Sequence, residues 1–201
     1  MKAWESIALV FVLAVAGTLR FTNLETNPGW YSDEGTLADI TRHLTEGKVR
    51  YLAINRSTLL AARLPLAPML ASALTPLGAS PLQTLRLLAA TSGVLTTGLL
   101  FVLSRRVTGS LGLGLLSGGL LAIYPPAVFY SRIGFSYNLL APLVVLALGG
   151  LWFYLDRRSR AGLALAALAI GIGSLIDLMM IALAGPLVVV MLVTRRRDLA
   201  W

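Results

Sequence analysis

The sequence predicts an all-α membrane protein with about six transmembrane helices and a large first outer loop that carries membrane-parallel amphipathic helices. Of the 201 residues, 57% are hydrophobic and 13% are charged, whereas charged side chains make up about 25% of a typical soluble domain. The mean hydropathy is +0.79. Several apolar stretches approach the roughly 20 residues that a helix needs to cross about 30 Å of hydrocarbon. We therefore expect lipid, rather than water, to be the main solvent of the chain.

The positive charge is arranged as a topology signal. The net charge is +8, but the arginines stand in short runs between apolar segments and form no basic face with interleaved aromatics, which excludes a nucleic-acid-binding protein. Short loops rich in Lys and Arg stay in the cytoplasm. The clusters expected there, together with Lys2, are 104–106, 156–160 and 195–198. Cysteine is absent, which excludes disulfides, thiol catalysis and thiolate metal sites.

The N-terminal segment, residues 1–22, is expected to be an uncleaved first transmembrane helix. Its charged start and short apolar run also fit a secretory signal peptide. However, the run continues to Arg20 without a polar cleavage region, and with Trp4 at its start it is long enough to span. A transmembrane helix is therefore favoured over a signal peptide.

Five more apolar segments within residues 85–194 are expected to span the membrane: 85–103, 111–130, 137–155, 161–176 and 178–193. The last two form one stretch that would be about 50 Å long as a single helix at 1.5 Å per residue, so we expect a turn near Asp177. This arrangement places both termini, including a tail over 195–201, in the cytoplasm. The chain is thus predicted to form a single multi-pass domain, 1–201, in the inner (plasma) membrane.

The outer loop, residues 23–84, is expected to lie at the non-cytoplasmic surface. Its apolar part, 59–77, is interrupted by Arg63 and by three prolines. A charge near a helix centre costs about 2.5–3.5 kcal/mol on insertion scales, and proline leaves backbone groups unsatisfied. A surface-lying or re-entrant helix is therefore favoured over a further span.

The polar part of this loop holds most of the acidic residues, among them Asp33 and Glu34. Ser32 is predicted to cap an amphipathic helix that has Leu37 and Ile40 on one face. Asp33 and Glu34 then fall in its first turn, where the helix dipole favours negative charge by roughly 0.3–1 kcal/mol. The dipole alone explains the pair, so a structural role and a catalytic role both stay open at this point.

Seven short motifs recur in an order that resembles a known family. They are Trp30-Tyr31-Ser32-Asp33-Glu34-Gly35, Arg63-Leu64-Pro65-Leu66, Leu77-Gly78-Ala79-Ser80-Pro81, Leu85-Arg86-Leu87, Arg105-Arg106-Val107-Thr108-Gly109, Tyr124-Pro125 and Tyr130-Ser131-Arg132. Together they resemble the N-terminal half of a C-type (GT-C) glycosyltransferase, similar to the protein O-mannosyltransferase and lipid A aminoarabinose transferase group of family 39. The resemblance covers residues 19–155.

The resemblance implies an inverting glycosyltransferase that transfers a sugar from a polyprenyl-phosphate donor to an acceptor at the non-cytoplasmic face. Asp33, with Glu34 beside it, would supply the catalytic carboxylate that accepts the proton of the acceptor hydroxyl. Arg63, Arg86 and Arg132 would stabilise the departing lipid phosphate, although each could instead extend to lipid headgroups. The expected partners are membrane lipid and the polyprenyl-phosphate sugar.

The chain also departs from the family pattern. Many relatives carry an acidic residue shortly after the Ser-Arg motif, where this chain reads Gly134-Phe135-Ser136-Tyr137-Asn138. Asp177 is a candidate substitute for binding substrate at the outer face, because an ionisable group near membrane depth is a functional candidate by default; it could instead cap a turn. No metal ligand is assigned and no cofactor is expected with certainty, while a divalent metal stays open.

Relatives continue with further membrane helices beyond the region of resemblance. The chain is therefore expected to be either part of a longer enzyme or a non-catalytic structural or accessory subunit of a larger membrane complex, with other membrane subunits as partners. A small transporter is less favoured, because the spans contain almost no paired charges or broken-helix pairs of the kind that mark transport paths.

Overall fold

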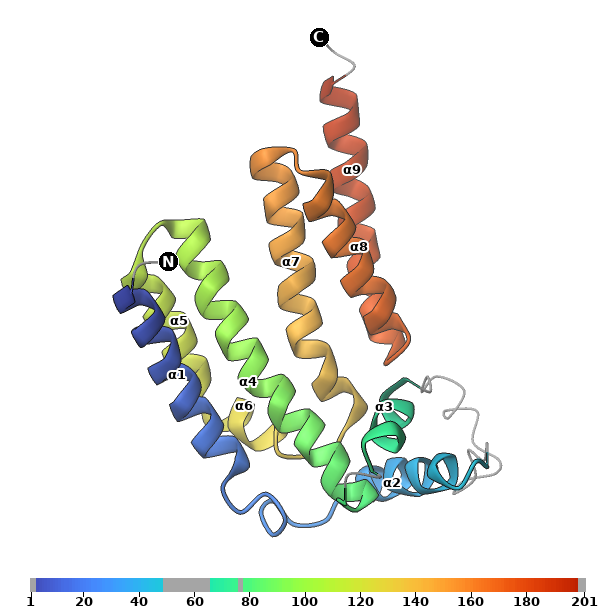
Figure 1. Ribbon diagram of the computed structural model, residues 1–201. Helices are drawn as coiled ribbons and strands as arrows, with labels where there is room; N and C mark the ends of the chain where they lie inside the picture. Colours follow the sequence, from blue (N-terminus) through green and yellow to red (C-terminus); the bar gives the residue numbers. More distant parts are fainter. Residues whose placement is uncertain (1–2, 49–65, 76–77, 199–201) are drawn as a thin grey trace.

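The computed structural model describes residues 3–48, 66–75 and 78–198 as a bundle of helices with two short helices across one end (Figure 1). No β-strand occurs in these ranges. Helix α4 (Pro81–Thr108) is central and packs against α1 (Ala3–Phe21), α5 (Leu111–Ile123) and α7 (Leu140–Arg157). Helix α8 (Arg160–Ser174) pairs with α7. The all-α membrane fold predicted from the sequence is confirmed.

Three stretches of the described chain are long and apolar enough to cross a bilayer. They are α1 with 19 residues, α4 with 28 residues and Ser136–Arg157 with 22 residues. The last of these joins the 3₁₀ helix η3 (Ser136–Leu139) to α7. The remaining apolar helices, α5, α8 and Leu178–Val193, are shorter. The six expected apolar segments therefore appear as three full-length helices and three shorter ones.

The predicted span 111–130 is not a single helix, and that prediction was wrong. Helix α5 ends at Ile123, and the short helix α6 (Pro125–Tyr130) follows Tyr124, whose backbone is extended. Pro125 and Pro126 have no N–H with which to continue the hydrogen bonds of α5. The segment 111–130 is apolar along its whole length, so hydropathy alone does not reveal the break that the two prolines cause after Ile123.

The predicted turn near Asp177 is confirmed. Helix α8 ends at Ser174, and Asp177 is the N-cap of the 3₁₀ helix η4 (Leu178–Leu183). Its carboxylate accepts a hydrogen bond of 3.0 Å from the backbone N–H of Met179. Helix α9 (Ala184–Asp198) then runs back towards the other end of the bundle (Figure 1).

Two short helices, α2 (Ser32–Thr45) and α3 (Leu66–Leu74), lie at one end of the bundle, with α2 nearly perpendicular to the long helices (Figure 1). With nine residues, α3 is about 14 Å long at 1.5 Å per residue, too short to cross a bilayer. This agrees with the prediction for the part of 59–77 that the structure describes. Leu37, Ala71 and Leu85 form a buried apolar cluster that joins α2, α3 and α4.

The amphipathic pattern predicted for α2 is confirmed, since Leu37 and Ile40 are both buried. The predicted cap is wrong by one residue. The N-cap is Tyr31, and no side chain caps the helix there. Ser32 is instead the first helical residue, so the first turn takes its stability from other contacts, described below.

Small residues bring α7 and α8 into close contact. A Cβ atom added to Gly150 would lie 2.6 Å from the carbonyl oxygen of Gly162 and 2.8 Å from the backbone nitrogen of Ala166. Only glycine fits at such a distance, which is the usual way in which small residues let membrane helices pack.

Candidate functional site

The carboxylate of Glu34 is the centre of a buried cluster at the end of the bundle where α2 and α3 lie. The Glu34 side chain is entirely shielded from solvent. Its Oε1 accepts hydrogen bonds from Nε of Arg86 at 2.9 Å and from the backbone N–H of Gly134 at 2.6 Å, and its Oε2 accepts one from Nη2 of Arg86 at 2.8 Å. These contacts join α2 to α4 and to the turn that follows α6. They also hold the first turn of α2 without an N-terminal side-chain cap.

Arg86 uses the rest of its guanidinium on the loop between α1 and α2. Its Nη1 donates to the carbonyls of Leu24 and Glu25, and its Nη2 donates to the carbonyl of Gly29. Together with the two bonds to Glu34, these contacts engage all three nitrogens, which carry five N–H donors in an arginine. Arg86 therefore ties the loop between α1 and α2 to the start of α4.

Arg132 holds the same loop from the other side. Its guanidinium donates to the backbone carbonyls of Leu19, Thr22, Asn23 and Asn27. Burial, and then the positive charge of nearby Arg86, lowers the pKa of Arg132, although a guanidinium stays charged in proteins. None of the described acidic side chains forms an ion pair with it.

Three of the predicted site residues are thus brought together in space: Glu34, Arg86 and Arg132. Asp33, the proposed base, precedes Glu34 in the first turn of α2 and is half-buried. Arg63, a further predicted phosphate ligand, lies outside the described residues.

Asp177 lies apart from this cluster. It caps η4 at the end of α8, next to the start of α3, where the N–H of Leu66 donates to the carbonyl of Leu175 at 3.3 Å. Its observed contact is the turn-capping one that the sequence left as an alternative. The substrate-binding role of Asp177 stays a prediction.

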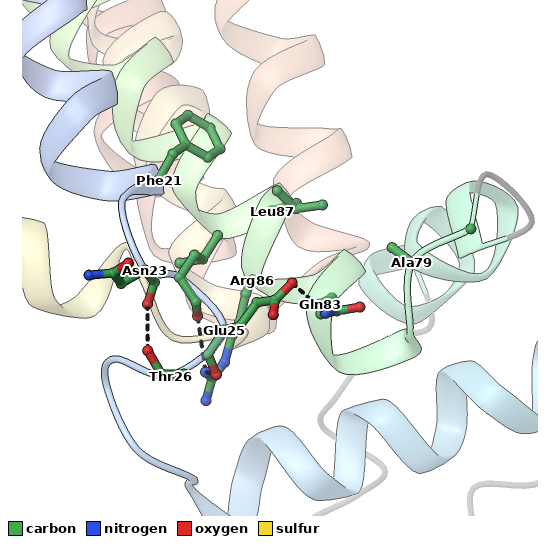
Figure 2. Close-up of a pocket in the computed structure, with 10 residues that line it drawn as sticks. Phe21, Asn23, Glu25, Thr26, Ala79, Gln83, Arg86 and Leu87 are labelled. Carbon is green, nitrogen blue, oxygen red and sulfur yellow. Dashed lines mark hydrogen bonds between the residues drawn. The ribbon is translucent and has the colours of Figure 1, made fainter.

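A cavity of about 800 Å³ lies beside Arg86, between the end of α1, the loop that follows it and the start of α4 (Figure 2). Its size falls within the range of about 300–1,000 Å³ typical of small-molecule sites. The lining combines apolar and polar side chains: Phe21, Asn23, Leu24, Glu25, Thr26, Gly78, Ala79, Gln83, Arg86 and Leu87. Figure 2 shows the carboxylate of Glu25 beside the amide of Gln83, from which it accepts a hydrogen bond of 2.8 Å.

Sequence reasoning missed Gln83 and the cavity itself. The available signal was the capping box at the start of α4, in which Ser80 and Gln83 exchange hydrogen bonds. That box holds the Gln83 side chain at the N-terminal end of α4, within hydrogen-bond distance of Glu25 in the loop after α1. Glu25, which accepts the hydrogen bond from Gln83, appears in the sequence only as one of several acidic residues between 23 and 84.

Sequence reasoning also missed Arg20, which is 1% exposed in the last turn of α1. Its Nη1 donates to the carbonyls of Ala16 and Ala122, and its Nη2 donates to the carbonyl of Leu121. In a continuous helix, the carbonyls of residues 121 and 122 would accept from the N–H groups of residues 125 and 126. Those residues are prolines, so Arg20 supplies the two donors that the prolines lack.

The residues that the structure describes contain no group of three or more histidine or acidic side chains placed to hold a metal ion. The cluster around Glu34 instead neutralises its carboxylate with a guanidinium and a backbone N–H.

A comparison with protein families now places the chain. The profile of the dolichyl-phosphate-mannose-protein mannosyltransferase family matches residues 62–200. The chain belongs to this family. No curated protein and no solved structure matches the chain. The resemblance to a GT-C glycosyltransferase read from the short motifs is thereby confirmed.

Membership in the mannosyltransferase family makes the chain a membrane glycosyltransferase of the GT-C type. The matched range contains Arg86, Arg132 and Asp177, whereas Asp33 and Glu34 precede it. The ion pair between Glu34 and Arg86 therefore connects α2 to the part of the chain that matches the family profile.

Proposed function

We propose that this chain forms the sugar-transfer region of an inverting glycosyltransferase, which moves a sugar from a polyprenyl-phosphate donor to an acceptor hydroxyl at the non-cytoplasmic face. Family membership supports the reaction class. The observation that carries the assignment to this site is the buried pair of Glu34 and Arg86, which ties the start of α2 to an arginine that lines a cavity of about 800 Å³.

Asp33 is the general base in this proposal. As the acceptor oxygen attacks the anomeric carbon, its O–H bond breaks and the proton passes to the Asp33 carboxylate. The bond between the anomeric carbon and the phosphate oxygen breaks at the same time, and its electron pair leaves with the polyprenyl phosphate. Attack from the face opposite the leaving phosphate inverts the anomeric carbon.

Glu34 has a positioning role in this proposal. Its carboxylate is fully buried and already accepts three hydrogen bonds, so it is poorly placed to take a proton from a substrate. Removing it would leave the Arg86 charge uncompensated and release the first turn of α2, which carries Asp33.

The guanidinium of Arg132 supplies positive charge for the departing phosphate. It forms no ion pair with a described acidic residue, whereas the charge of Arg86 is compensated by Glu34. Preorganised charge of this kind stabilises a transition state in which negative charge develops. Because the observed hydrogen bonds of Arg132 all go to backbone carbonyls, its contribution here is through charge rather than through direct hydrogen bonds.

The distribution of basic residues supports a non-cytoplasmic site. Arg105 and Arg106 lie in the last turn of α4, and Arg157 lies in the last turn of α7. These helix ends point away from α2 and α3, and the start of α1 and the end of α9 lie towards the same side (Figure 1). By the positive-inside rule, this pattern supports a cytoplasmic position for the basic end and a position at the opposite face for the cluster around Glu34.

The test is sugar transfer by the purified protein in detergent, with a polyprenyl-phosphate sugar as donor. We expect Asp33→Asn to lower the rate at least 100-fold, since general base catalysis contributes about 10²–10⁴-fold. The matched control is Asp39→Asn, which removes another carboxylate from the same helix. The Asp39 carboxylate pairs with exposed Arg42 at 2.7 Å. Equal rates for wild type and Asp33→Asn would remove the proposed role.

A second candidate function is that of an accessory subunit. The specific observation in its favour is that Glu34, Arg86 and Arg132 direct their hydrogen bonds to the protein itself. Purification from native membranes separates the two candidates, because a subunit is expected in a stoichiometric complex whose activity does not respond to Asp33→Asn.

A further inference from the structure

The cavity beside Arg86 has an apolar part and a polar part. Phe21 and Leu87, which are 40% and 43% exposed, line the apolar part. Figure 2 shows them above the hydrogen-bonded pair of Glu25 and Gln83, which lines the polar part. In a ligand site, a few polar groups fix the orientation of the ligand and determine specificity. The chemistry of these polar groups therefore indicates which ligand the cavity accepts.

Arg86 offers no free donor to a ligand in this cavity. Its guanidinium has five N–H donors, of which two go to Glu34 and three to backbone carbonyls of the loop between α1 and α2. Its charge is compensated by the Glu34 carboxylate at 2.8 Å. An anionic ligand would therefore find neither a free N–H nor an uncompensated positive charge at Arg86.

Glu25 gives the lining a net negative charge. It is the only charged residue of the lining besides Arg86, and it is exposed. None of the ion pairs between described residues includes it, and its observed partner, the side-chain amide of Gln83, is neutral. Because like charges repel each other, the cavity disfavours a ligand that carries negative charge near Glu25.

The pair of Glu25 and Gln83 presents hydrogen-bond acceptors beside a donor. The ionised carboxylate only accepts and has about four lone-pair sites, one of which is used by Gln83. The Gln83 amide has a second N–H, and its Oε1 accepts from the backbone N–H of Ser80 in the capping box, which fixes the amide. Neighbouring hydroxyl groups of a sugar ring match this arrangement, since each hydroxyl both donates and accepts.

We propose that Glu25 and Gln83 determine sugar specificity: they bind the hydroxyl groups of the sugar that enters the cavity, and the Glu25 carboxylate excludes acidic sugars. Phe21 and Leu87 provide the apolar surface for the C–H face of the ring. Placing a like charge against the wrong ligand is a general means of specificity. The inference rests on the proposed function and deepens it, but binding of the sugar requires no proton transfer to Asp33.

The test is titration of the protein in a sugar-free detergent, followed by saturation-transfer NMR. The probes are the neutral methyl glycosides of mannose, glucose and galactose and the methyl glycosides of the corresponding uronic acids, in which a carboxylate replaces the hydroxymethyl group. We expect the wild type to bind the best neutral glycoside about fivefold or more tightly than its uronic acid counterpart. Glu25→Gln should weaken neutral binding and bring this affinity ratio close to one.

Glu46→Gln is the matched control, because it removes an exposed carboxylate that lies outside the cavity and pairs with Lys48 at 2.9 Å. It should keep the wild-type ratio. Gln83→Glu is a second variant, since glutamate also forms a capping box but places a second carboxylate beside Glu25. This variant should discriminate against the uronic acid glycosides more strongly than the wild type does.

The outcomes also separate this inference from the proposed base. The same ratio in wild type and Glu25→Gln, or no binding of any neutral glycoside by the wild type, overturns the role of Glu25. Asp33→Asn should keep the wild-type ratio, so a loss of sugar transfer in that variant bears only on the proposed function. A ratio that changes in Glu25→Gln, with normal transfer by Asp33→Asn, would support the sugar site and contradict the base.

Discussion

Glu34 and Arg86 stand 52 residues apart in the sequence and form a two-point ion pair in which neither side chain is more than 3% exposed. The pair connects the crosswise helix α2 to the central helix α4. Because Arg86 also donates to three carbonyls of the loop between α1 and α2, a single guanidinium connects this loop, α2 and the start of α4.

Breaking this pair should destabilise the fold. We expect Glu34→Gln to lower the free energy of unfolding by about 3–5 kcal/mol, because removing one partner leaves a buried charge uncompensated. Thermal unfolding in detergent, followed by circular dichroism, measures the effect. Asp39→Asn on the same helix breaks an exposed pair and should leave the unfolding temperature nearly unchanged; matching losses in both variants would contradict the structural role of Glu34.

The prolines after α5 and Arg20 should show coupled effects on stability. Arg20→Met leaves the carbonyls of Leu121 and Ala122 without donors, at a cost of about 1–3 kcal/mol for each buried group. Adding Pro125→Ala and Pro126→Ala restores two backbone N–H groups, so we expect this triple variant to regain part of the lost stability. Unfolding of the single, double and triple variants in one detergent tests the coupling, and strictly additive losses would contradict it.

The contact between α7 and α8 should not tolerate a larger residue. We expect Gly150→Ala to lower the free energy of unfolding by about 1–3 kcal/mol through overpacking, since its Cβ would meet the backbone of Gly162 at 2.6 Å. Gly171→Ala in α8 is the control, because nothing lies within 4 Å of its Cβ. It should be neutral or stabilising by up to about 1 kcal/mol from helix propensity. If thermal unfolding showed Gly171→Ala to be more destabilising than Gly150→Ala, the close packing of α7 on α8 at Gly150 would be contradicted.

Filling the cavity beside Arg86 should impair sugar transfer while leaving the fold intact. Ala79→Trp places a bulky ring in the lining of the cavity beside Arg86. We expect kcat/KM for the polyprenyl-phosphate donor to fall at least tenfold, which corresponds to about 1.4 kcal/mol. Ala73→Trp, at an exposed position of α3 outside the lining, is the control. Equal kcat/KM values for the two variants would show that substrates do not use this cavity.

Local patterns in the sequence were sufficient for several features of the protein. Apolar stretches predicted its membrane-helical class, the excessive length of 161–193 predicted a turn at Asp177, and the spacing of Leu37 and Ile40 predicted α2. Interruption by Arg63 and prolines predicted that α3 would not span. Each of these features depends on hydropathy, length or periodicity within one segment, and these properties can be read from the sequence of that segment alone.

Other features depend on how distant segments meet. The three donors around Glu34, the carbonyls held by Arg132, the cavity beside Arg86 and the contact of Arg20 with the end of α5 all join residues far apart in the chain. The short motifs indicated the family and pointed to Glu34, Arg86 and Arg132 as site residues. They did not show that the hydrogen bonds of Arg86 and Arg132 hold the loop between α1 and α2. The catalytic role of Asp33 stays a prediction.

What the sequence alone determined is therefore the solvent, the helical class and the family of this protein. The tertiary structure decided which charges are compensated and which are left: Glu34 is neutralised by Arg86, whereas Arg20 and Arg132 meet only backbone carbonyls among their described partners. The physical reason is that apolar burial follows from composition within a segment, while a hydrogen bond requires a donor and an acceptor within about 3 Å, a distance that only the packing of whole helices sets.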